Sequence, residues 1–191
     1  MGAQPVGAPA IFVTAAPSPD GQFILVRRVR RPYSWLVPYA NFPANIEVWD
    51  RNGAQVKLVA QLPVADNVPN GGVLPGPRSF QWQPLAPATV AWAEALDNGD
   101  PKAKVPHRDK VMTMSAPFTA APAEIARTEY RYSGIAWTDS GAALLTENDR
   151  TRRWTRTWSG RRCASTWMST STALCHFSTR RVRGSNLAPG T

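Results

Sequence analysis

The segment from Arg150 to Cys163, RTRRWTRTWSGRRC, contains the residues of this chain that most strongly suggest chemistry. Arginines alternate with tryptophans and threonines, and no acidic residue interrupts them. Guanidinium groups bind phosphates and indole rings stack on bases, so this mixture is typical of a nucleic-acid-binding arm. The same residues also fit a β-strand, in which the arginines and tryptophans would have a structural function.

Part of this segment has a period of two, which predicts a strand from Thr151 to Trp158. Its two faces would carry Arg152, Trp154, Arg156 and Trp158 on one side, and Thr151, Arg153, Thr155 and Thr157 on the other. Arginines placed in this way belong to a strand, and they are no independent signal for nucleic acid.

The basic charge of the whole chain is concentrated after Asp149. The chain has 22 Lys and Arg against 13 Asp and Glu, and its last 42 residues contain no acid. The nine arginines found there are Arg150, Arg152, Arg153, Arg156, Arg161, Arg162, Arg180, Arg181 and Arg183. The first 149 residues hold 13 basic and 13 acidic side chains and are therefore neutral. Such an asymmetry normally indicates an interaction tail.

Acids and a histidine near one turn are the next candidates for chemistry. His107 has Asp109 close by, but a lone histidine beside a strand is far more often structural or solvated than catalytic. Glu94, Asp97 and Asp100 surround the turn DNGDP, where acids usually cap the backbone, and no metal-ligand set accompanies them.

The remaining candidates are equally weak. Cys163 and the pair Cys175–His176 do not have the spacing of a zinc site, because a second paired motif is missing. The cluster RRVRRPY, Arg27 to Tyr33, is expected to point its arginines to one face of a strand, as a solvated or substrate-facing edge rather than a nucleic-acid site. We assign no catalytic, cofactor-binding or metal-binding residue, and we expect no cofactor.

The elements that would position these residues are strands throughout. Apolar runs with β-branched residues are QFILVRRV, NIEVWD, AQVKLVA, ATVAWAEAL, DKVMTMSA, YRYSGIAW and AALLTEN. Turn residues separate them: SPDG precedes the first, Asn52-Gly53 joins the second and third, and DNGDP follows the fourth. Many short antiparallel strands predict an all-β sandwich, barrel or propeller.

An internal repeat favours the propeller. PSPDGQFILV from Pro17, WQPLAPATVAW from Trp82 and WTDSGAALLT from Trp137 each place a bulky residue before a polar turn and an apolar run. Irregular repeats of this kind are typical of four-stranded propeller blades. A chance recurrence of strand, turn and strand is the alternative.

No segment indicates a membrane or a secretory route. No apolar run approaches the roughly 20 residues that span a bilayer. The N-terminus has no basic residues before its apolar ones, and prolines interrupt it, so a signal peptide is not expected. The sequence assigns no compartment.

Several long strings resemble the propeller of the prolyl oligopeptidase family of serine peptidases, in its glutamyl-endopeptidase-like branch. They include SPDGQFILVRRVRRPYSWLVPYANFPANIEVWDRNG, PATVAWAEALDNGDPKAKVPHRDKVMTMSAPF and TEYRYSGIAW. The resemblance extends from about Ala15 to Trp158. It implies about three blades of an incomplete β-propeller, which in such peptidases admits peptides to a catalytic α/β-hydrolase domain and excludes folded proteins.

The catalytic half of such a peptidase is not visible in this chain. Acyl transfer there needs a G-x-S-x-G nucleophile elbow, which the sequence does not contain, so no triad residue can be carried over. Whether the chain is an enzyme is therefore uncertain, and we expect it to be inactive alone. The implied partners are peptide substrates and the hydrolase domain, and not a membrane or a nucleic acid.

After Trp158 the resemblance stops, and the sequence becomes rich in Ser-Thr pairs. If Ser is TCG and Thr is ACG, STWMSTST (Ser165 to Thr172) reads Asp-Val-Asp-Val-Asp-Val-Asp in another frame. The aspartate at Trp167-Met168 is forced, because both residues have unique codons. A frameshift near the codon of Trp158 would explain this text; a disordered arginine-rich arm is the alternative.

The sequence thus predicts three regions. Residues 1–14 form an irregular segment, residues 15–158 form the partial propeller that gates substrates, and residues 159–191 form an irregular, off-frame tail. The competing hypothesis is a stand-alone, propeller-like binding module whose basic tail contacts nucleic acid or another polyanion. Steeply salt-dependent binding to an oligonucleotide would favour that alternative.

Overall fold

The fold is all-β, as the sequence predicts. The computed structural model describes residues 6–139 and 142–160. Its strands are β1 (Phe12–Pro17), β2 (Phe23–Val29), β3 (Ala44–Asp50), β4 (Gln55–Leu62), β5 (Arg78–Trp82), β6 (Thr89–Ala95), β7 (Asp109–Ser115), β8 (Ala123–Thr128), β9 (Arg131–Trp137), β10 (Ala143–Asp149) and β11 (Trp154–Gly160). Within these described ranges the only helix is a single 3₁₀ turn, Tyr39–Asn41.

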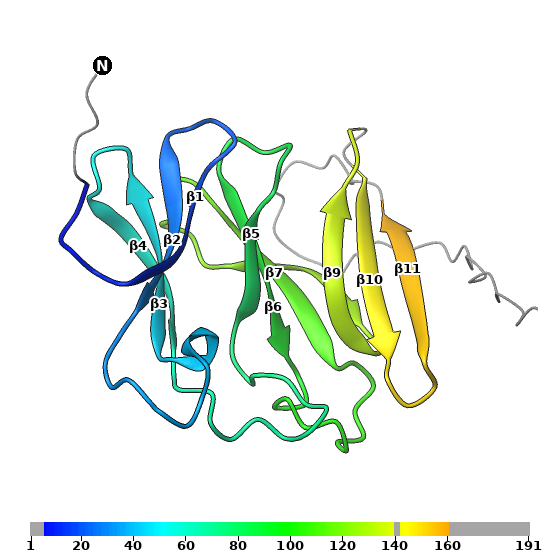
Figure 1. Ribbon diagram of the computed structural model, residues 1–191. Coiled ribbons are helices and arrows are strands. Elements are labelled where there is room, and N and C mark those ends of the chain that lie inside the picture. Colours follow the sequence, from blue (N-terminus) through cyan, green and yellow to red (C-terminus); the bar gives the residue numbers. More distant parts are fainter. Residues whose placement is uncertain (1–5, 140–141, 161–191) are drawn as a thin grey trace, which may run out of the picture.

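The strands form three antiparallel sheets that follow one another along the chain. The first sheet has the order β1-β2-β3-β4, the second β5-β6-β7-β8, and the third β9-β10-β11. Figure 1 shows the three sheets side by side, each a meander of neighbouring strands. Sheets of this kind are consistent with successive blades of an open propeller.

The predicted repeat coincides with the same turn in each sheet. Pro17, Trp82 and Trp137 are the last residues of β1, β5 and β9, the first strands of their sheets. The next residue then closes the turn through its backbone N–H, in bonds from Ser18 to Phe23 O, from Gln83 to Thr89 O, and from Thr138 to Ala142 O, at 2.8 Å each. The recurrence is therefore structural and not a chance of composition.

The first strands of the three sheets are linked to one another. The indole N–H of Trp82 in β5 donates to the carbonyl of Ala16 in β1 at 2.8 Å. The adjacent residue of β5, Gln81, donates from Nε2 to the carbonyl of Ile135 in β9 at 3.0 Å. Thus β5 contacts β1 on one side and β9 on the other, so the first strands of the three sheets lie next to one another.

The hairpin predicted at Asn52-Gly53 is present between β3 and β4. Asp50 organises it: its Oδ1 accepts the N–H groups of Asn52 at 2.8 Å and Ala54 at 2.9 Å, while its carbonyl accepts that of Gly53 at 3.1 Å. The aspartate thus satisfies the turn backbone, which is the usual function of an Asx turn.

The core lies between the sheets, on both faces of the second sheet. The layer between the first and second sheets comprises Leu25, Ile46, Val48, Leu62, Ala88, Val90, Trp92, Met112, Met114 and Phe118. The layer between the second and third comprises Ala93, Val111, Ala126, Tyr132 and Leu145. Successive residues of β6 and β7 therefore enter opposite layers, which explains why these strands have continuous apolar runs.

Three predicted boundaries differ from the structure. β11 begins at Trp154, because residues 151–153 form a turn after β10. The prediction of a strand from Thr151 was therefore wrong over these three residues, and Arg152 lies in the turn. At the other end β1 begins at Phe12, inside the range 1–14 expected to be irregular. The ring of Phe12 packs edge-on against Trp49, at 5.7 Å between centroids, and this contact favours the strand. The irregular tail was expected from residue 159, but Ser159 and Gly160 pair with Leu144 and Ala143 of β10 and belong to β11. The rest of that tail, residues 161–191, lies outside the described residues.

A glycine at the turn after β6 provides a test of this packing. Gly99 has φ of +77°, and a Cβ there would lie 2.0 Å from the carbonyl oxygen of Val73. Gly21 has φ of +66° with nothing within 4 Å of such a Cβ. We expect Gly99→Ala to lower the free energy of unfolding by more than about 2 kcal/mol, because strain and a backbone clash combine. Gly21→Ala should cost about 1 kcal/mol from strain alone. Urea unfolding followed by tryptophan fluorescence measures both, and equal losses would contradict this account.

Candidate functional site

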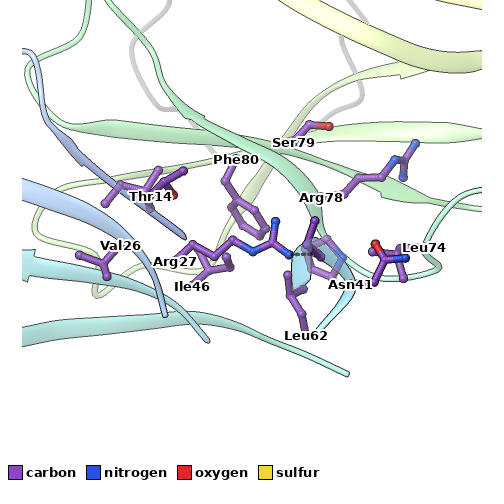
Figure 2. A pocket seen from close by; sticks show the side chains of 13 residues that line it. Thr14, Val26, Arg27, Asn41, Ile46, Leu62, Leu74, Arg78, Ser79 and Phe80 are labelled. Atoms are coloured by element: carbon purple, nitrogen blue, oxygen red, sulfur yellow. Dashed lines mark hydrogen bonds between the residues drawn. The ribbon is translucent and has the colours of Figure 1, made fainter. Parts of the chain in front are cut away.

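A cavity of about 400 Å³ lies between the first and second sheets and is the candidate binding site. Its apolar walls are formed by Leu25, Val26, Ile46, Leu62, Leu74 and Phe80. Figure 2 shows these walls closing around polar groups from β1, β2, the 3₁₀ turn and β5. Mostly apolar cavities with a few fixed polar groups are the usual form of ligand sites in proteins.

Arg27 is the principal polar group of this cavity. Its side chain extends from β2 toward Asn41, and its Nη2 donates to the carbonyl of Ala40 at 2.5 Å (Figure 2). The Nε of Arg27 is buried and has no hydrogen-bond partner. The same is true of Arg28 and Arg30, so what distinguishes Arg27 is its place in the lining of the cavity.

The cluster RRVRRPY does not present its arginines on one face, and that prediction was wrong. Arg27 and Arg28 are consecutive residues of β2, so strand alternation sends them to opposite faces. Arg27 enters the cavity, whereas Arg28 pairs with Glu47 at 2.7 Å. Arg30, beyond the strand, donates to the carbonyl of Leu62. These arginines join elements of the first sheet rather than forming a common charged surface.

A bulge in β5 shapes the other side of the cavity. The pairing of β5 with β6 shifts between Arg78 and Gln81, and Ser79 has φ of +58°. A bulge of this kind changes the direction of the side chains on either side of it. Here the ring of Phe80 stacks on that of Trp92, with 5.9 Å between the ring centroids. Ser79 lines the cavity, but no histidine or carboxylate does, so its hydroxyl has no general base there.

Behind the cavity, Arg78 takes part in a buried network centred on Asp109. The Oδ1 of Asp109 lies 2.7 Å from Nη2 of Arg78, an ion pair not aligned as a hydrogen bond, and it accepts Nη1 of Arg131 at 3.0 Å. Its Oδ2 accepts the N–H of Tyr132 at 2.7 Å. The Asp109 side chain is fully buried, so one carboxylate of β7 binds β5 and β9 together.

Asp97 extends this network into the turn after β6. Arg131 pairs with it through both terminal nitrogens, and Arg108 donates to its Oδ2 at 2.7 Å. Burial by itself would raise the pKa of Asp97, but hydrogen bonds and charge from Arg131 and Arg108 outweigh burial and hold this pKa below its usual value. Asp97 also accepts the N–H of Gly99 at 3.0 Å, which is the capping function expected from sequence.

The other sequence candidates have structural positions as well. Glu94 accepts the Trp92 indole N–H and pairs with Lys110, while Asp100 accepts the N–H of Lys102. His107 is half-buried in the loop before β7, and it makes none of the contacts to Asp109 described above. Cys163, Cys175 and His176 lie outside the described residues. Within the described ranges no group of histidines and acids could hold a metal ion.

Sequence reasoning missed a recurring pair of an indole and a carboxylate, one in each sheet. Trp49 donates to Glu47 at 2.8 Å, Trp92 to Glu94 at 2.7 Å, and Trp158 to Glu147 at 2.6 Å. The side chains of Glu47 and Glu147 are fully buried. Burial would raise the pKa of Glu47, but donors from Arg28, Asn45 and Trp49 outweigh it and lower the pKa. For Glu47 and Glu94, an acid two residues from a tryptophan in an apolar run was the available signal; Glu147 and Trp158 are 11 residues apart and gave none.

A second hollow, of about 750 Å³, lies beside the turn between β10 and β11. Five arginines line it, Arg108, Arg131, Arg150, Arg152 and Arg153, together with Asp149. Arg108 and Arg131 are engaged by Asp97, whereas the three arginines of the turn are exposed. This hollow holds the exposed part of the arginine-rich segment. The described residues form no helix of the length and apolar character needed to cross a membrane.

Asp109→Asn should destabilise the chain strongly. The substitution leaves Arg78 and Arg131 facing a neutral amide in a buried site, and losing one partner of a buried ion pair costs about 3–5 kcal/mol. The matched control is Glu124→Gln, which breaks the exposed Glu124–Arg127 pair and should cost less than about 0.5 kcal/mol. Denaturant unfolding compares the two, and a similar small loss in both would refute the central position given to Asp109.

The ionisation of Tyr132 gives a prediction for alkaline pH. Burial raises the pKa of Tyr132 from 10.0 to about 12, so between these values the unfolded chain loses the phenolic proton before the folded chain does. The stability due to this group is therefore complete below pH 10 and declines as pH rises toward 12. Two pKa units correspond to about 2.7 kcal/mol. Unfolding titrations across this range should show a smaller decline for Tyr132→Phe than for the unsubstituted chain, and parallel curves would count against it.

The chain is similar to two curated proteins, each described as a probable glutamyl endopeptidase, chloroplastic. The protein of Oryza sativa subsp. japonica is 36% identical over 159 residues, which cover 81% of this chain and 17% of the relative. That of Arabidopsis thaliana is 40% identical over 157 residues, covering 80% and 16%. The chain therefore spans about one sixth of the length of these relatives.

Other comparisons add little. No known family profile matches the chain. A solved structure, described as the crystal structure of the eukaryotic initiation factor, is 15% identical and covers 78% of this chain and 43% of its own, but its TM-score of 0.34 is too low to carry an argument. The resemblance to glutamyl endopeptidases is confirmed by the curated relatives. Over about four fifths of its length, this chain is homologous to one segment of the chloroplastic glutamyl endopeptidases.

Proposed function

We propose that the chain is part of the substrate-gating β-propeller of a serine peptidase of the prolyl oligopeptidase family. The observation that carries this proposal is its 36–40% identity to glutamyl endopeptidases. The three sheets and the linked first strands β1, β5 and β9 support it, because blades meet at the axis of a propeller through such strands. Peptide hydrolysis itself is assigned to another part of the whole enzyme.

In this proposal the described residues bind and select but do not perform acyl transfer. The cavity between the first two sheets offers Arg27 as a donor within apolar walls, which suits a peptide carrying an acceptor and an apolar side chain. The buried pairs of Asp109 and Asp97 hold the second and third sheets together. A rigid ring wall of this kind would admit a flexible peptide and exclude a folded protein.

We also propose that the text after Trp158 comes from a change of reading frame. Support comes from the alternating Asp-Val reading of Ser165 to Thr172, in which the aspartate at Trp167-Met168 is independent of codon choice. Resequencing the gene tests this directly. A single frame continuous through this point, with no peptidase-like reading in another frame, would overturn it.

The alternative of a polyanion-binding module is less well supported. Arg28, Arg108, Arg131 and Arg156 are engaged by carboxylates, and Arg27 and Arg30 donate to carbonyls. Guanidinium groups already paired in this way are not available to phosphates. The exposed arginines of the turn after β10 are the feature of the described residues that favours a polyanion, because three of them line one hollow.

A chimera tests the gating function. Residues 12–160 of this chain would replace the matching segment of the Arabidopsis thaliana glutamyl endopeptidase. We expect kcat/KM for a short peptide to stay within about tenfold of the parent, since tenfold corresponds to only ~1.4 kcal/mol and the catalytic groups are untouched. A folded protein substrate should remain uncleaved.

The control is the same chimera with Asp109→Asn, which should lose the exclusion of folded protein as its sheets separate. Two results would contradict the proposal: a soluble chimera without peptidase activity, or one that cleaves folded and unfolded protein equally well. An oligonucleotide that binds the unsubstituted chain with a steep salt dependence would favour the alternative instead.

A further inference from the structure

The turn between β10 and β11 carries three arginines that the fold leaves largely unpaired. Arg150, Arg152 and Arg153 are exposed there and line the hollow of about 750 Å³. Among the described residues, Arg150 and Arg153 have neither an ion pair nor a side-chain hydrogen bond. Arg152 has only its 3.7 Å ion pair with Asp149, whose Oδ1 already accepts the N–H groups of Thr151 and Arg152. The turn therefore presents largely uncompensated positive charge to the hollow.

The floor of the hollow is formed by ion pairs that are already complete. Arg108 and Arg131 line it, and both pair with Asp97, whose side chain is fully buried. Arg108 also donates to three backbone carbonyls of the β6–β7 connection, at 3.1–3.3 Å. Figure 1 shows this connection at the same end of the sheets as the β10–β11 turn. The floor is therefore fixed in place, and the net charge of the hollow comes from the turn.

Aromatic rings form another wall of the hollow. Tyr130 and Trp154 line it, with their rings in edge contact at 4.6 Å between centroids. The guanidinium of Arg156 lies 5.5 Å and 5.3 Å from the same two ring centres and helps to hold them in place. The lining also includes the amide of Asn148 and the hydroxyls of Thr151 and Thr155. A hollow of this size is typical of small-molecule sites and is much larger than a single phosphate ion needs.

The backbone at Arg153 shows that this side chain is not required by the fold. Arg153 has φ of +54°, a conformation that strains an L-residue and that glycine adopts freely. The side chain is exposed and forms no bond that would offset the strain. A glycine would therefore suit the turn better, so the presence of an arginine favours a function in binding.

We propose that this hollow binds a nucleoside polyphosphate. Guanidinium groups bind phosphate oxygens through two parallel hydrogen bonds, which assigns the phosphates to Arg150, Arg152 and Arg153. The base would then lie against the wall formed by Tyr130 and Trp154, since every base has a face that stacks on aromatic rings. A single nucleotide is favoured over a nucleic-acid strand because the three unpaired arginines lie within one turn and line one hollow. The site does not depend on the gating function proposed above.

The probe is ATP, titrated into the full chain by calorimetry in a buffer that contains EDTA. We expect one site per chain and an affinity that falls as salt is raised, because exposed charges are screened. Adenosine and tripolyphosphate should each bind at least about tenfold more weakly than ATP, because each keeps only part of the contacts. Equal affinities for ATP and tripolyphosphate, or no binding of ATP, would overturn the inference.

An oligonucleotide distinguishes the hollow from an extended polyanion surface. At physiological salt a strand of about twelve thymidines should bind no more tightly than ATP, because its additional phosphates lie outside the hollow. Tighter binding of the strand would show that the arginines contact a nucleic acid, and it would contradict a nucleotide site.

Two triple variants with the same loss of charge make the test specific. Arg150→Gln with Arg152→Gln and Arg153→Gln should lower the affinity for ATP by at least about thirtyfold, because charge-assisted hydrogen bonds are lost. The matched control is Arg180→Gln with Arg181→Gln and Arg183→Gln, which should bind ATP as the unsubstituted chain does. Equal weakening by both variants would show that only net charge attracts ATP, and the site would be refuted.

Arg153→Gly separates binding from stability. This variant removes one guanidinium and relieves the backbone strain, so its Tm should equal or exceed that of the unsubstituted chain while its affinity for ATP falls about fivefold. Thermal unfolding and calorimetry measure the two effects. Unchanged affinity would exclude Arg153 from the site, and a lower Tm would assign it the structural function that the proposal denies.

Discussion

The structure depends on one constraint, which is that every carboxylate buried between its sheets must be supplied with donors. Asp109 shows this most clearly, because its single side chain contacts two arginines and a backbone amide from strands of different sheets. A carboxylate that loses these partners in a dry interior costs more than most apolar contacts contribute. The second and third sheets are consequently held at one relative position by these contacts.

Within each sheet the same constraint is met by tryptophan. Glu47, Glu94 and Glu147 each accept an indole N–H, and the ring that carries this donor also covers apolar surface. One residue type thus satisfies an acid and fills space between strands. This explains why a chain with eight tryptophans has so few large aliphatic residues in its third sheet. Acid and indole are two residues apart on one strand in the first two sheets, β3 and β6, and they lie on adjacent strands, β10 and β11, in the third.

Strands and turns were predictable because their causes are local. Alternation, β-branched residues and turn residues such as Asn52-Gly53 act within a few positions, so β2, β3, β4, β6, β7, β9 and β10 lie close to where the sequence places them. The strand analysis did not include β5 and β8. The network of Asp97, Asp109 and Arg131 was not predictable, since its members are brought together by sheet packing across 34 residues. Strand limits near Arg152 failed for a related reason: Asp149 accepts the N–H groups of Thr151 and Arg152 and makes a turn of residues that alternate like a strand.

The alternation of arginine and tryptophan therefore has a physical cause that needs no nucleic acid. The guanidinium of Arg156 lies 4.1 Å from the ring centre of Trp158 and 5.3 Å from that of Trp154, and it pairs with the buried Glu147. It also bonds Glu129, and these partners raise the pKa of Arg156 despite its partial burial. Both rings thus lie against an ion pair that joins β10 and β11, and these contacts already engage the guanidinium of Arg156. The arginines of the preceding turn are exposed instead, and Arg152 makes only a long ion pair with Asp149, at 3.7 Å, so the inward-facing arrangement begins with the strand at Trp154.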